Sequence, residues 1–302
     1  MPSFPDRLAE AVRRRGPLCV GIDPRWESLP ISIRQAFAAG AEQQDRAKAF
    51  EAFSLQVLDL VEPFCAVIKP QAAFFEQLGL PGFAALDRIL KSARERGFVT
   101  ILDAKRGDIA STAAAYAEAA FSDDVWNADA LTVNPYLGAD AVEPFVSEAT
   151  KRNRGLFVLV RTSNPGSAEL QDVKLATGQT WSEALAEKLA VIADRPALVG
   201  KHGYSSLGAV VGATQTHTIE SMRSRLPKSI FLLPGYGTQG ATADMTRKAF
   251  DSKGRGAIVS ASRSILYAHR EEKYKSQHGE DWTKCVLDAV QDMRNDLRNV
   301  LK

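Results

Sequence analysis

The sequence predicts a single-domain, eight-stranded β/α barrel of the TIM type that spans residues 1–302. Eight short apolar runs recur along the chain, and nearly all of them precede a stretch in which apolar residues have helical spacing. The length also lies in the range that such barrels occupy as one unit. An open, doubly wound sheet would show the same alternation, but the count of eight runs favours a closed barrel.

The predicted strands are nearly all apolar, as parallel strands buried on both faces must be. In chain order they are 18–23, 65–69, 99–105, 130–134, 156–161, 208–213, 230–234 and 257–261. The predicted helices are 4–15, 46–62, 83–96, 108–122, 139–151, 180–193, 215–226, 241–250 and 282–300. Two connections are long, 24–45 and 162–207, and we interpret them as covers over a site at the carboxyl ends of the strands.

Composition excludes several classes of function. There are 38 lysines and arginines against 36 acids, and the net charge of +2 offers no field that would recruit nucleic acid or a membrane surface. Cys19, Cys65 and Cys285 are too few and too far apart for a disulfide framework or a zinc site, so we expect reduced thiols in a cytoplasmic protein. We expect no signal peptide and no membrane-spanning segment.

The third predicted strand carries the densest group of charged residues. Asp103 and Lys105 are two residues apart, so in a regular strand both side chains point to the barrel mouth. Gly107 permits a tight turn, after which Asp108 can cap the next helix, and Thr112 lies four residues further on the same helical face. An ion pair with an ordinary helix cap explains these residues equally well when they are taken alone.

Two other strands also end in charge. Asp23 follows the first strand and Lys69 closes the second. Either residue by itself is more typical of a structural salt bridge than of a catalytic group. Together with Asp103 and Lys105, however, they place two acids and two lysines on three adjacent strand ends, which favours an active site.

The last two strands are followed by segments suited to phosphate. Residues 233–240 read Leu-Pro-Gly-Tyr-Gly-Thr-Gln-Gly, and Arg263 stands between two serines after the eighth strand. Barrels commonly hold phosphate in these two loops, where glycines allow close approach of the backbone and an arginine can grip the dianion. A glycine-rich turn alone is weak evidence, but its place in the strand order strengthens it.

The sequence shows no pattern typical of histidine-based, metal-dependent or dinucleotide-dependent chemistry. The four histidines fall in loops or helices away from the predicted strand ends, and we assign none of them a catalytic role. No spacing of histidines and carboxylates indicates a metal site, no Ser/His/Asp set falls on the strand ends, and no dinucleotide-binding fingerprint occurs in the required context.

The motifs as a set resemble those of the orotidine 5′-phosphate decarboxylase family, and in particular its longer bacterial branch. The likeness covers nearly the whole chain. The Asp-x-Lys-x-x-Asp element is shared with a wider superfamily that includes sugar-phosphate decarboxylases, and the remaining motifs are more specific. The set consists of Gly-Ile-Asp23-Pro, Ile-Lys69-Pro-Gln, Leu-Asp103-Ala-Lys105-Arg-Gly-Asp108-Ile, Thr132-Val-Asn-Pro-Tyr, Ser163-Asn-Pro-Gly, Val-Gly-Ala213-Thr214, Pro-Gly-Tyr-Gly-Thr-Gln239-Gly and Ser262-Arg263-Ser264.

This resemblance implies conversion of orotidine 5′-monophosphate to uridine 5′-monophosphate and carbon dioxide, the last step of pyrimidine synthesis, without metal or organic cofactor. It implies that Lys105 protonates C6 beside Asp103, and that Asp108 and Thr112 reach the ribose region of the partner site in a homodimer. The implied substrate contacts are ribose for Asp23 and Lys69, the pyrimidine for Ser163, and the phosphate for Gly237, Gln239, Ser262 and Arg263. The longer connection 162–207 leaves Lys201, His202 and Tyr204 without an assigned role.

Three other functions remain open at this point. A metal-dependent sugar-phosphate decarboxylase would be sensitive to a chelator. An aldolase that uses Lys69 or Lys105 as a Schiff-base nucleophile would be trapped by borohydride with its substrate. A non-catalytic phosphate-ligand barrel would bind nucleotide tightly without turnover, although a lysine flanked by acids would then be an unexplained cost.

Overall fold

The eight predicted strands close into one parallel barrel. The protein is described from a computed structural model that covers residues 2–37, 42–213, 216–237 and 240–301. Each strand pairs with the next along the chain, and the first also pairs with the last, so the sheet has no open edge. The strands are β1 (Leu18–Ile22), β2 (Val67–Pro70), β3 (Val99–Arg106), β4 (Ala130–Val133), β5 (Gly155–Arg161), β6 (Ser205–Val211), β7 (Ser229–Pro234) and β8 (Ala257–Ala261).

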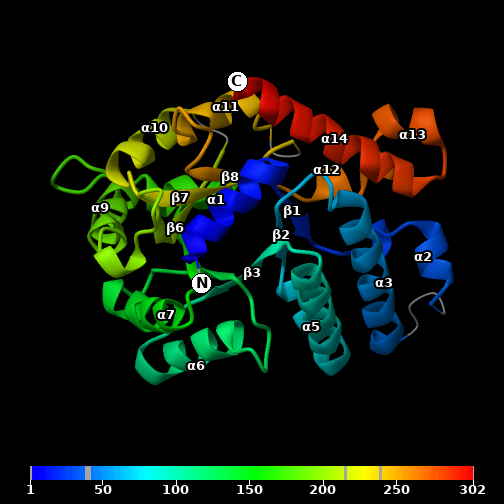
Figure 1. Ribbon diagram of the computed structural model, residues 1–302, viewed down its shortest axis with the longest axis horizontal. Helices are drawn as coiled ribbons and strands as arrows, with labels where there is room; N and C mark the ends of the chain where they lie inside the picture. Colours follow the sequence, from blue (N-terminus) through cyan, green and yellow to red (C-terminus); the bar gives the residue numbers. More distant parts are fainter. Residues whose placement is uncertain (1, 38–41, 214–215, 238–239, 302) are drawn as a thin grey trace.

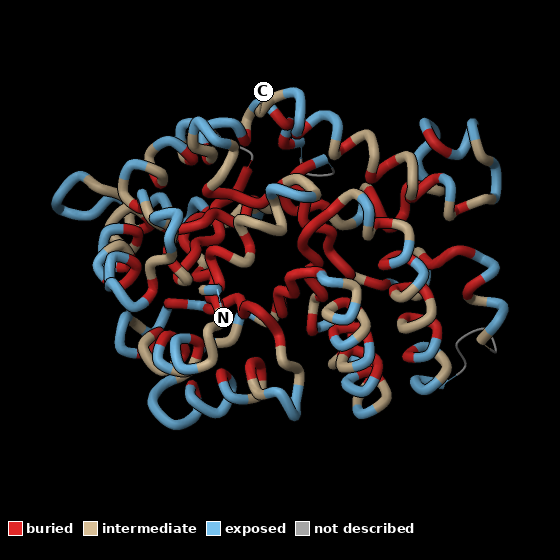
Figure 2. Tube along the Cα trace, in the orientation of Figure 1, coloured by how far each residue is buried: buried red, intermediate tan, exposed pale blue. Residues whose placement is uncertain are grey.

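The helices form a ring around the barrel, and buried backbone is concentrated in the strands and on the inner sides of this ring (Figure 1, Figure 2). None of the helices in the described ranges is both long and apolar enough to cross a membrane. The helices are α1 (Phe4–Arg15), α2 (Ile31–Gln35), α3 (Gln43–Val61), α4 (Ala73–Glu76), α5 (Gly79–Glu95), α6 (Ala110–Phe121), α7 (Ala139–Lys151), α8 (Ala168–Gln171), α9 (Trp181–Ala193), α10 (Thr216–Arg225), α11 (Ala243–Thr246), α12 (Arg263–Leu266), α13 (Glu272–His278) and α14 (Trp282–Val300).

One predicted helix is wrong in its extent. The segment 241–250 contains only the four residues of α11 and a short 3₁₀ turn, Arg247–Ala249. Within it the hydroxyl of Thr246 donates a hydrogen bond of 2.7 Å to the carbonyl of Ala243. A side-chain bond of this kind competes with a continued helix, and the buried alanines of the segment, Ala241, Ala243 and Ala249, can pack without one.

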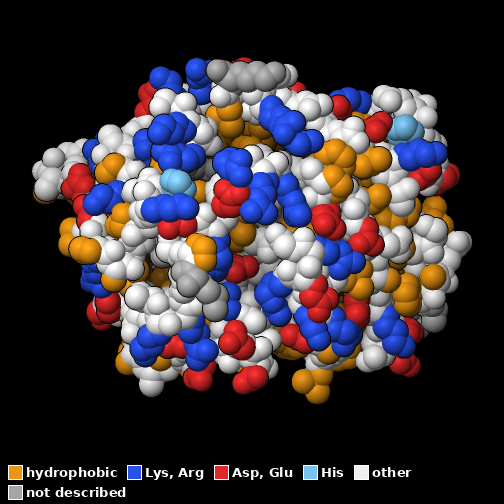
Figure 3. Space-filling view, in the orientation of Figure 1, with side chains coloured by type: hydrophobic (Ala, Val, Ile, Leu, Met, Phe, Trp, Pro, Cys, Tyr) orange, Lys and Arg blue, Asp and Glu red, His pale blue; other side chains and the backbone are white. Residues whose placement is uncertain are grey.

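The amino end of the barrel is covered by α1. Its Phe4 is almost completely buried and packs edge-on against Phe157 of β5, with ring centroids 6.4 Å apart. Gly155 makes this possible, because a Cβ there would lie 2.1 Å from the Phe4 ring. Figure 3 shows the face that α1 crosses, where basic and acidic side chains are interspersed. The opposite end, where the strands finish, remains for a site.

The barrel interior is filled by apolar side chains from the strands, in a cluster that includes Phe157, Val210 and Leu232. Val210 and Leu232 also line the cavity described below, so the top of this core is the floor of that cavity. All three cysteines are buried and unpaired. Burial raises the pKa of the Cys19 thiol to about 12, which keeps it protonated and unreactive.

Candidate active site

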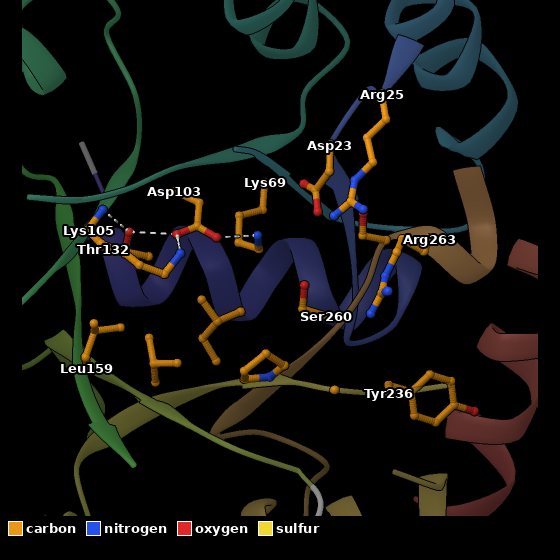
Figure 4. Close-up of a pocket in the computed structure, with 15 residues that line it drawn as sticks. Asp23, Arg25, Lys69, Asp103, Lys105, Thr132, Leu159, Tyr236, Ser260 and Arg263 are labelled. Carbon is orange, nitrogen blue, oxygen red and sulfur yellow. Dashed lines mark hydrogen bonds and ion pairs between the residues drawn. The ribbon is translucent and has the colours of Figure 1, made fainter. Parts of the chain in front are cut away.

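A cavity of about 320 Å³ opens at the carboxyl ends of the strands. Asp23 enters it from the end of β1, Lys69 from β2, and Asp103 and Lys105 from β3. Ser262 and Arg263, which follow β8, line it from the other side. Six of the residues predicted from sequence therefore meet in one cavity, and Figure 4 shows Asp103 between the two lysines at one end and Arg263 at the other.

Asp103 is the centre of the charged group. Its Oδ2 accepts a hydrogen bond from Lys69 Nζ at 2.6 Å, and its Oδ1 accepts one from Lys105 Nζ at 2.6 Å and one from the Thr132 hydroxyl at 2.9 Å. The Asp103 and Lys69 side chains are 9% exposed, whereas that of Lys105 is 46% exposed. Asp103 thus holds one buried cation and one that reaches open space.

The pKa values within this group follow from burial and charge. Burial by itself would raise the pKa of Asp103, but the charges of Lys69 and Lys105 and their hydrogen bonds outweigh it and hold the pKa well below its usual value. Burial would lower the pKa of Lys69, and the opposing charges of Asp103 and Asp23 raise it above its usual value instead. Asp103 is therefore an ionised acceptor at neutral pH, and Lys69 is a charged partner.

The backbone at Lys105, whose side chain lines the cavity at the barrel mouth, departs from regular strand geometry. Its φ is +47°, in the left-handed region that side chains other than glycine rarely adopt. Leu102 pairs with Leu131 whereas Arg106 pairs with Val133, so β3 advances four residues while β4 advances two. The expected meeting of Asp103 and Lys105 is confirmed, but the regular strand alternation from which we predicted it does not hold here.

Thr132 of β4 supports this distortion, and the sequence analysis gave it no role. Its hydroxyl oxygen accepts hydrogen bonds from the backbone N–H of Ala104 at 3.1 Å and of Lys105 at 2.9 Å, while it donates to Asp103. One side chain thus fixes both the carboxylate and the bulge. A threonine at the end of an otherwise apolar strand was the available signal.

The opposite end of the cavity presents polar atoms without partners. Asp23 and Ser262 line the cavity, and their Oδ1 and Oγ atoms are buried and have no hydrogen-bond partner among the described residues. The buried Oγ of Ser264, two residues further along the chain, has none either. Gly237 has a φ of +77°, and a Cβ there would lie 3.0 Å from Ser264 Oγ, so glycine keeps this approach open. Buried polar atoms of this kind are usually satisfied, and here they indicate a polar ligand. Gln239, the other predicted residue of this region, lies outside the described residues.

Ser163 lies in an adjoining cavity of about 470 Å³ rather than in the first one. The two cavities share Lys105, Leu159, Val210 and Pro234 in their walls, so together they form one continuous region across the barrel mouth. Ser163 follows β5, and a Cβ on Gly212 would lie 3.2 Å from it. Glycine at 212 therefore lets the Ser163 backbone pack closely against the end of β6.

Asp108 and Thr112 do not line either cavity in the chain that carries them. The expected helix cap is wrong, because α6 begins at Ala110 and its N-cap position is Ile109. Among the described residues, Asp108 Oδ1 accepts a hydrogen bond only from the adjacent Ile109 N–H, at 2.8 Å. The turn after the bulge keeps Asp108 outside the helix, so it shares no helical face with Thr112, which is exposed.

The fold and the charged cluster define a β/α-barrel enzyme with its site at the carboxyl ends of the strands. The sequence model of the orotidine 5′-phosphate decarboxylase / HUMPS family matches residues 16–276, and the chain belongs to this family.

Full-length relatives agree with the family match. The chain is 40% identical to a curated orotidine 5′-phosphate decarboxylase of Rhodopirellula baltica, across 99% of this chain and all of that one. A crystal structure of a putative orotidine 5′-phosphate decarboxylase from Streptomyces avermitilis superposes with a TM-score of 0.79 at 34% identity, covering 100% of this chain and 96% of that one. A putative orotidine-monophosphate decarboxylase structure from Toxoplasma gondii gives 0.82 at 31%, covering 99% and 97%.

Proposed function

We propose that this chain decarboxylates orotidine 5′-monophosphate to uridine 5′-monophosphate and carbon dioxide, the last step of pyrimidine nucleotide synthesis, without a metal or organic cofactor. The observation that carries the proposal is the Asp103 carboxylate held between Lys69 and Lys105 at 2.6 Å each, in an open cavity at the barrel mouth. The names of the full-length relatives supply the substrate.

In the proposed reaction the bond between C6 of the pyrimidine and its carboxylate breaks, and the electron pair stays on C6. The Lys105 ammonium stabilises this charge and then gives a proton to C6, and carbon dioxide leaves. An ammonium about 4 Å from the developing charge contributes on the order of 4 kcal/mol at an effective dielectric of about 20, roughly three decades in rate. Binding of the remote phosphate and ribose supplies the rest, because enzymes need about 8 to 23 kcal/mol in total.

The other predicted residues take binding roles in this proposal. Asp23 and Lys69 hold the ribose, and Ser163 contacts the pyrimidine from the adjoining cavity. The phosphate lies at the opposite end of the first cavity, near the buried oxygens that lack partners. Its proposed contacts are Gly237, Gln239, Ser262 and Arg263.

We further propose a homodimer in which Asp108 and Thr112 reach the partner's site. Large apolar side chains are exposed beside these residues: Ile109 is 56% exposed, Tyr136 68% and Leu137 52%. Asn134, which follows β4, donates a backbone hydrogen bond of 2.8 Å to Arg106, the last residue of β3, so the loops that carry these side chains begin side by side. Asp108 and Thr112 do not line the cavities of their own subunit, and they lie next to exposed apolar side chains. This combination supports a subunit interface there.

The activity is tested by mixing purified protein with orotidine 5′-monophosphate in the presence of a chelator and following the pyrimidine absorbance. Steady conversion to uridine 5′-monophosphate supports the proposal, and conversion that requires added divalent metal contradicts its cofactor-free part. Tight binding of uridine 5′-monophosphate without any turnover would instead support a binding protein.

The dimer is tested by complementation. Asp108→Ala and Lys105→Ala variants are each expected to be nearly inactive alone. If Asp108 acts across the interface, subunit exchange between them creates dimers in which one of the two sites has both residues, and activity returns. A mixture that stays inactive while mass measurement shows mixed dimers would place Asp108 in its own subunit's site or in none.

A further inference from the structure

Arg25 stands in the wall of the first cavity, and nothing in the sequence analysis assigned it a role. It follows β1 by three residues and lines the cavity together with Asp23 and Arg263. Its guanidinium lies 5.1 Å from the centre of the Phe74 ring. Among the described residues no carboxylate lies within ion-pairing distance of this guanidinium, and Arg25 is exposed. An arginine that supports the fold would usually hold a carboxylate or several carbonyl groups.

The backbone of Arg25 is held by a hydrogen bond, whereas its charged side chain is exposed. The Tyr267 hydroxyl accepts a hydrogen bond from the Arg25 N–H at 2.8 Å and donates one to the Asp23 carbonyl at 2.9 Å. Tyr267 is only 6% exposed and its ring stacks on Phe53 with an angle of 5° between the planes. Burial, with the charge of Asp23, raises the pKa of the phenol above its usual value, so it stays protonated and able to donate.

Tyr267 also joins this turn to the segment that carries Arg263. It follows α12 directly, and its N–H donates to the Arg263 carbonyl at 3.0 Å. Tyr267 therefore fixes the backbone positions from which the Arg25 and Arg263 side chains extend. Figure 4 shows the Arg25 side chain running past Asp23 toward the end of the cavity where Arg263 lies.

The charges at this end of the cavity favour an anion. With Arg25 and Arg263 opposite Asp23, the end carries one net positive charge, and without Arg25 it would carry none. The hydroxyl of Ser262, which lines the same cavity and has no partner among the described residues, can donate a hydrogen bond to an anion there. With Asp23 counted, a bound phosphate dianion would leave this end with a net charge of −2 if Arg263 acted alone and of −1 with both arginines, so the second guanidinium halves the unbalanced charge.

We propose that Arg25 is a second arginine for the 5′-phosphate, and that Tyr267 positions it, so that the pair sets the preference for a phosphorylated nucleotide over the bare nucleoside. This inference rests on the function proposed above. We define the phosphate preference as the Kd of uridine divided by the Kd of uridine 5′-monophosphate. Arg25 contributes to this ratio, since it acts on the group that distinguishes the two ligands.

The main test measures both Kd values by calorimetry for the wild type and for Arg25→Gln, in the whole chain. The phosphate preference is expected to fall about 10-fold to 100-fold, nearly all of it through weaker binding of uridine 5′-monophosphate. Arg25→Lys, which keeps the charge, should recover part of the loss. Arg270→Gln is the matched control: it removes a nearby exposed arginine that donates to Ser28 Oγ and does not line the cavity, and the preference should change less than 2-fold.

Tyr267→Phe tests the positioning role, because it keeps the stacked ring and removes only the hydroxyl. The phosphate preference should fall about 3-fold to 10-fold at a melting temperature within a few degrees of the wild type. The same change made in Arg25→Gln should lower it less than 2-fold further, since Tyr267 acts through Arg25. Additive losses would show that Tyr267 has a purely structural role.

The outcomes separate this inference from the proposed function. If the wild type converts orotidine 5′-monophosphate and Arg25→Gln keeps the wild-type phosphate preference, the inference is wrong and the function stands. An equal loss for uridine and its monophosphate would also overturn it, by assigning Arg25 to the sugar or base. A wild type that neither turns over the substrate nor distinguishes the two ligands would overturn both.

Discussion

The two ends of the barrel each bury an aspartate between two cations, beside a threonine. At the carboxyl end Asp103 lies between Lys69 and Lys105. At the amino end Asp129 lies between Arg7 at 2.9 Å and Arg154 at 3.1 Å. The other oxygen of Asp129 accepts from both the N–H and the hydroxyl of Thr100, at 3.0 and 3.2 Å.

The clusters differ in what their cations can do. Arg7 and Arg154 each use several N–H groups for fixed contacts, so their cluster joins α1 to the starts of β3, β4 and β5. A lysine is a compact donor that can give up its proton, and Lys105 extends into open space with its side chain 46% exposed. A buried acid with two cations is therefore no evidence for catalysis by itself. The kind of cation and the open space in front of it distinguish a catalytic cluster from a structural one.

The largest test of this contrast is Lys105→Ala. Turnover of orotidine 5′-monophosphate should fall at least about 1000-fold, because both the charge beside C6 and the proton donor are lost. Binding of uridine 5′-monophosphate should change less than about 10-fold. Single-turnover absorbance and calorimetry measure the two effects. Lys151→Ala, at an exposed surface pair with Glu148, is the control. A variant that kept a tenth of the wild-type rate would remove Lys105 from its role.

Asp129→Asn should show the opposite pattern. It leaves Arg7 without a counter-charge and Arg154 with only its exposed partner Asp123, in a mostly buried site, so the free energy of unfolding should fall by about 3 kcal/mol. The turnover number should stay within about 3-fold of the wild type. Denaturant unfolding followed by circular dichroism measures the loss, and Asp123→Asn, at an exposed partner of Arg154, should cost less than about 0.5 kcal/mol. If Asp129→Asn is as stable as the wild type, the amino-end cluster is not structural.

Substitution of one arginine at each end of the barrel tests the same difference between a ligand site and a structural cluster. Arg263→Ala should weaken binding of uridine 5′-monophosphate by about 2 kcal/mol and leave uridine binding nearly unchanged, because the phosphate loses a charged hydrogen-bond donor. Arg7→Ala should instead lower the unfolding free energy and leave both ligands unaffected. Calorimetry with the two ligands, next to denaturant unfolding, separates them. Equal weakening of both ligands by Arg263→Ala would contradict the phosphate placement.

The smallest effect concerns pH. The pKa of Asp103 is lowered on folding, so its contribution to stability is fully present above its unfolded pKa of about 4 and is lost as pH falls toward the folded value. Below about pH 4 the wild type should therefore lose stability more steeply than Asp103→Asn, by up to about 1.4 kcal/mol per pH unit. Unfolding curves between pH 5 and pH 2.5 measure this, and parallel slopes would show that Asp103 is not held ionised by its lysines.

The sequence was sufficient for the barrel because its signals are local and repeated. Each of the eight apolar runs became a strand, and charges at the ends of β1, β2 and β3 met because parallel strands end at one face. Features that depend on contacts between distant segments were missed. The hydroxyl of Thr132 reaches two N–H groups of another strand, and Tyr267 holds a turn more than 240 residues earlier. Neither contact leaves a periodic trace.

The errors have a related cause. The predicted cap at Asp108 assumed a regular exit from β3, but the bulge at Lys105 changes where the chain leaves the strand. The predicted helix 241–250 relied on the spacing of its apolar residues, which indicates burial but does not require a continuous helix. Local patterns thus describe regular elements well and irregular joints poorly, and the irregular joints are where this site is built.

The left-handed backbone of Lys105 sets a limit for anyone who wishes to make this protein more robust. Glycine adopts that conformation without steric cost, so Lys105→Gly would relieve about 1 kcal/mol of strain that the native chain carries. The same change deletes the ammonium on which the proposed chemistry depends. A search for thermostable variants that scored backbone strain alone would therefore favour an inert protein at this position, and selection must include turnover from the first round.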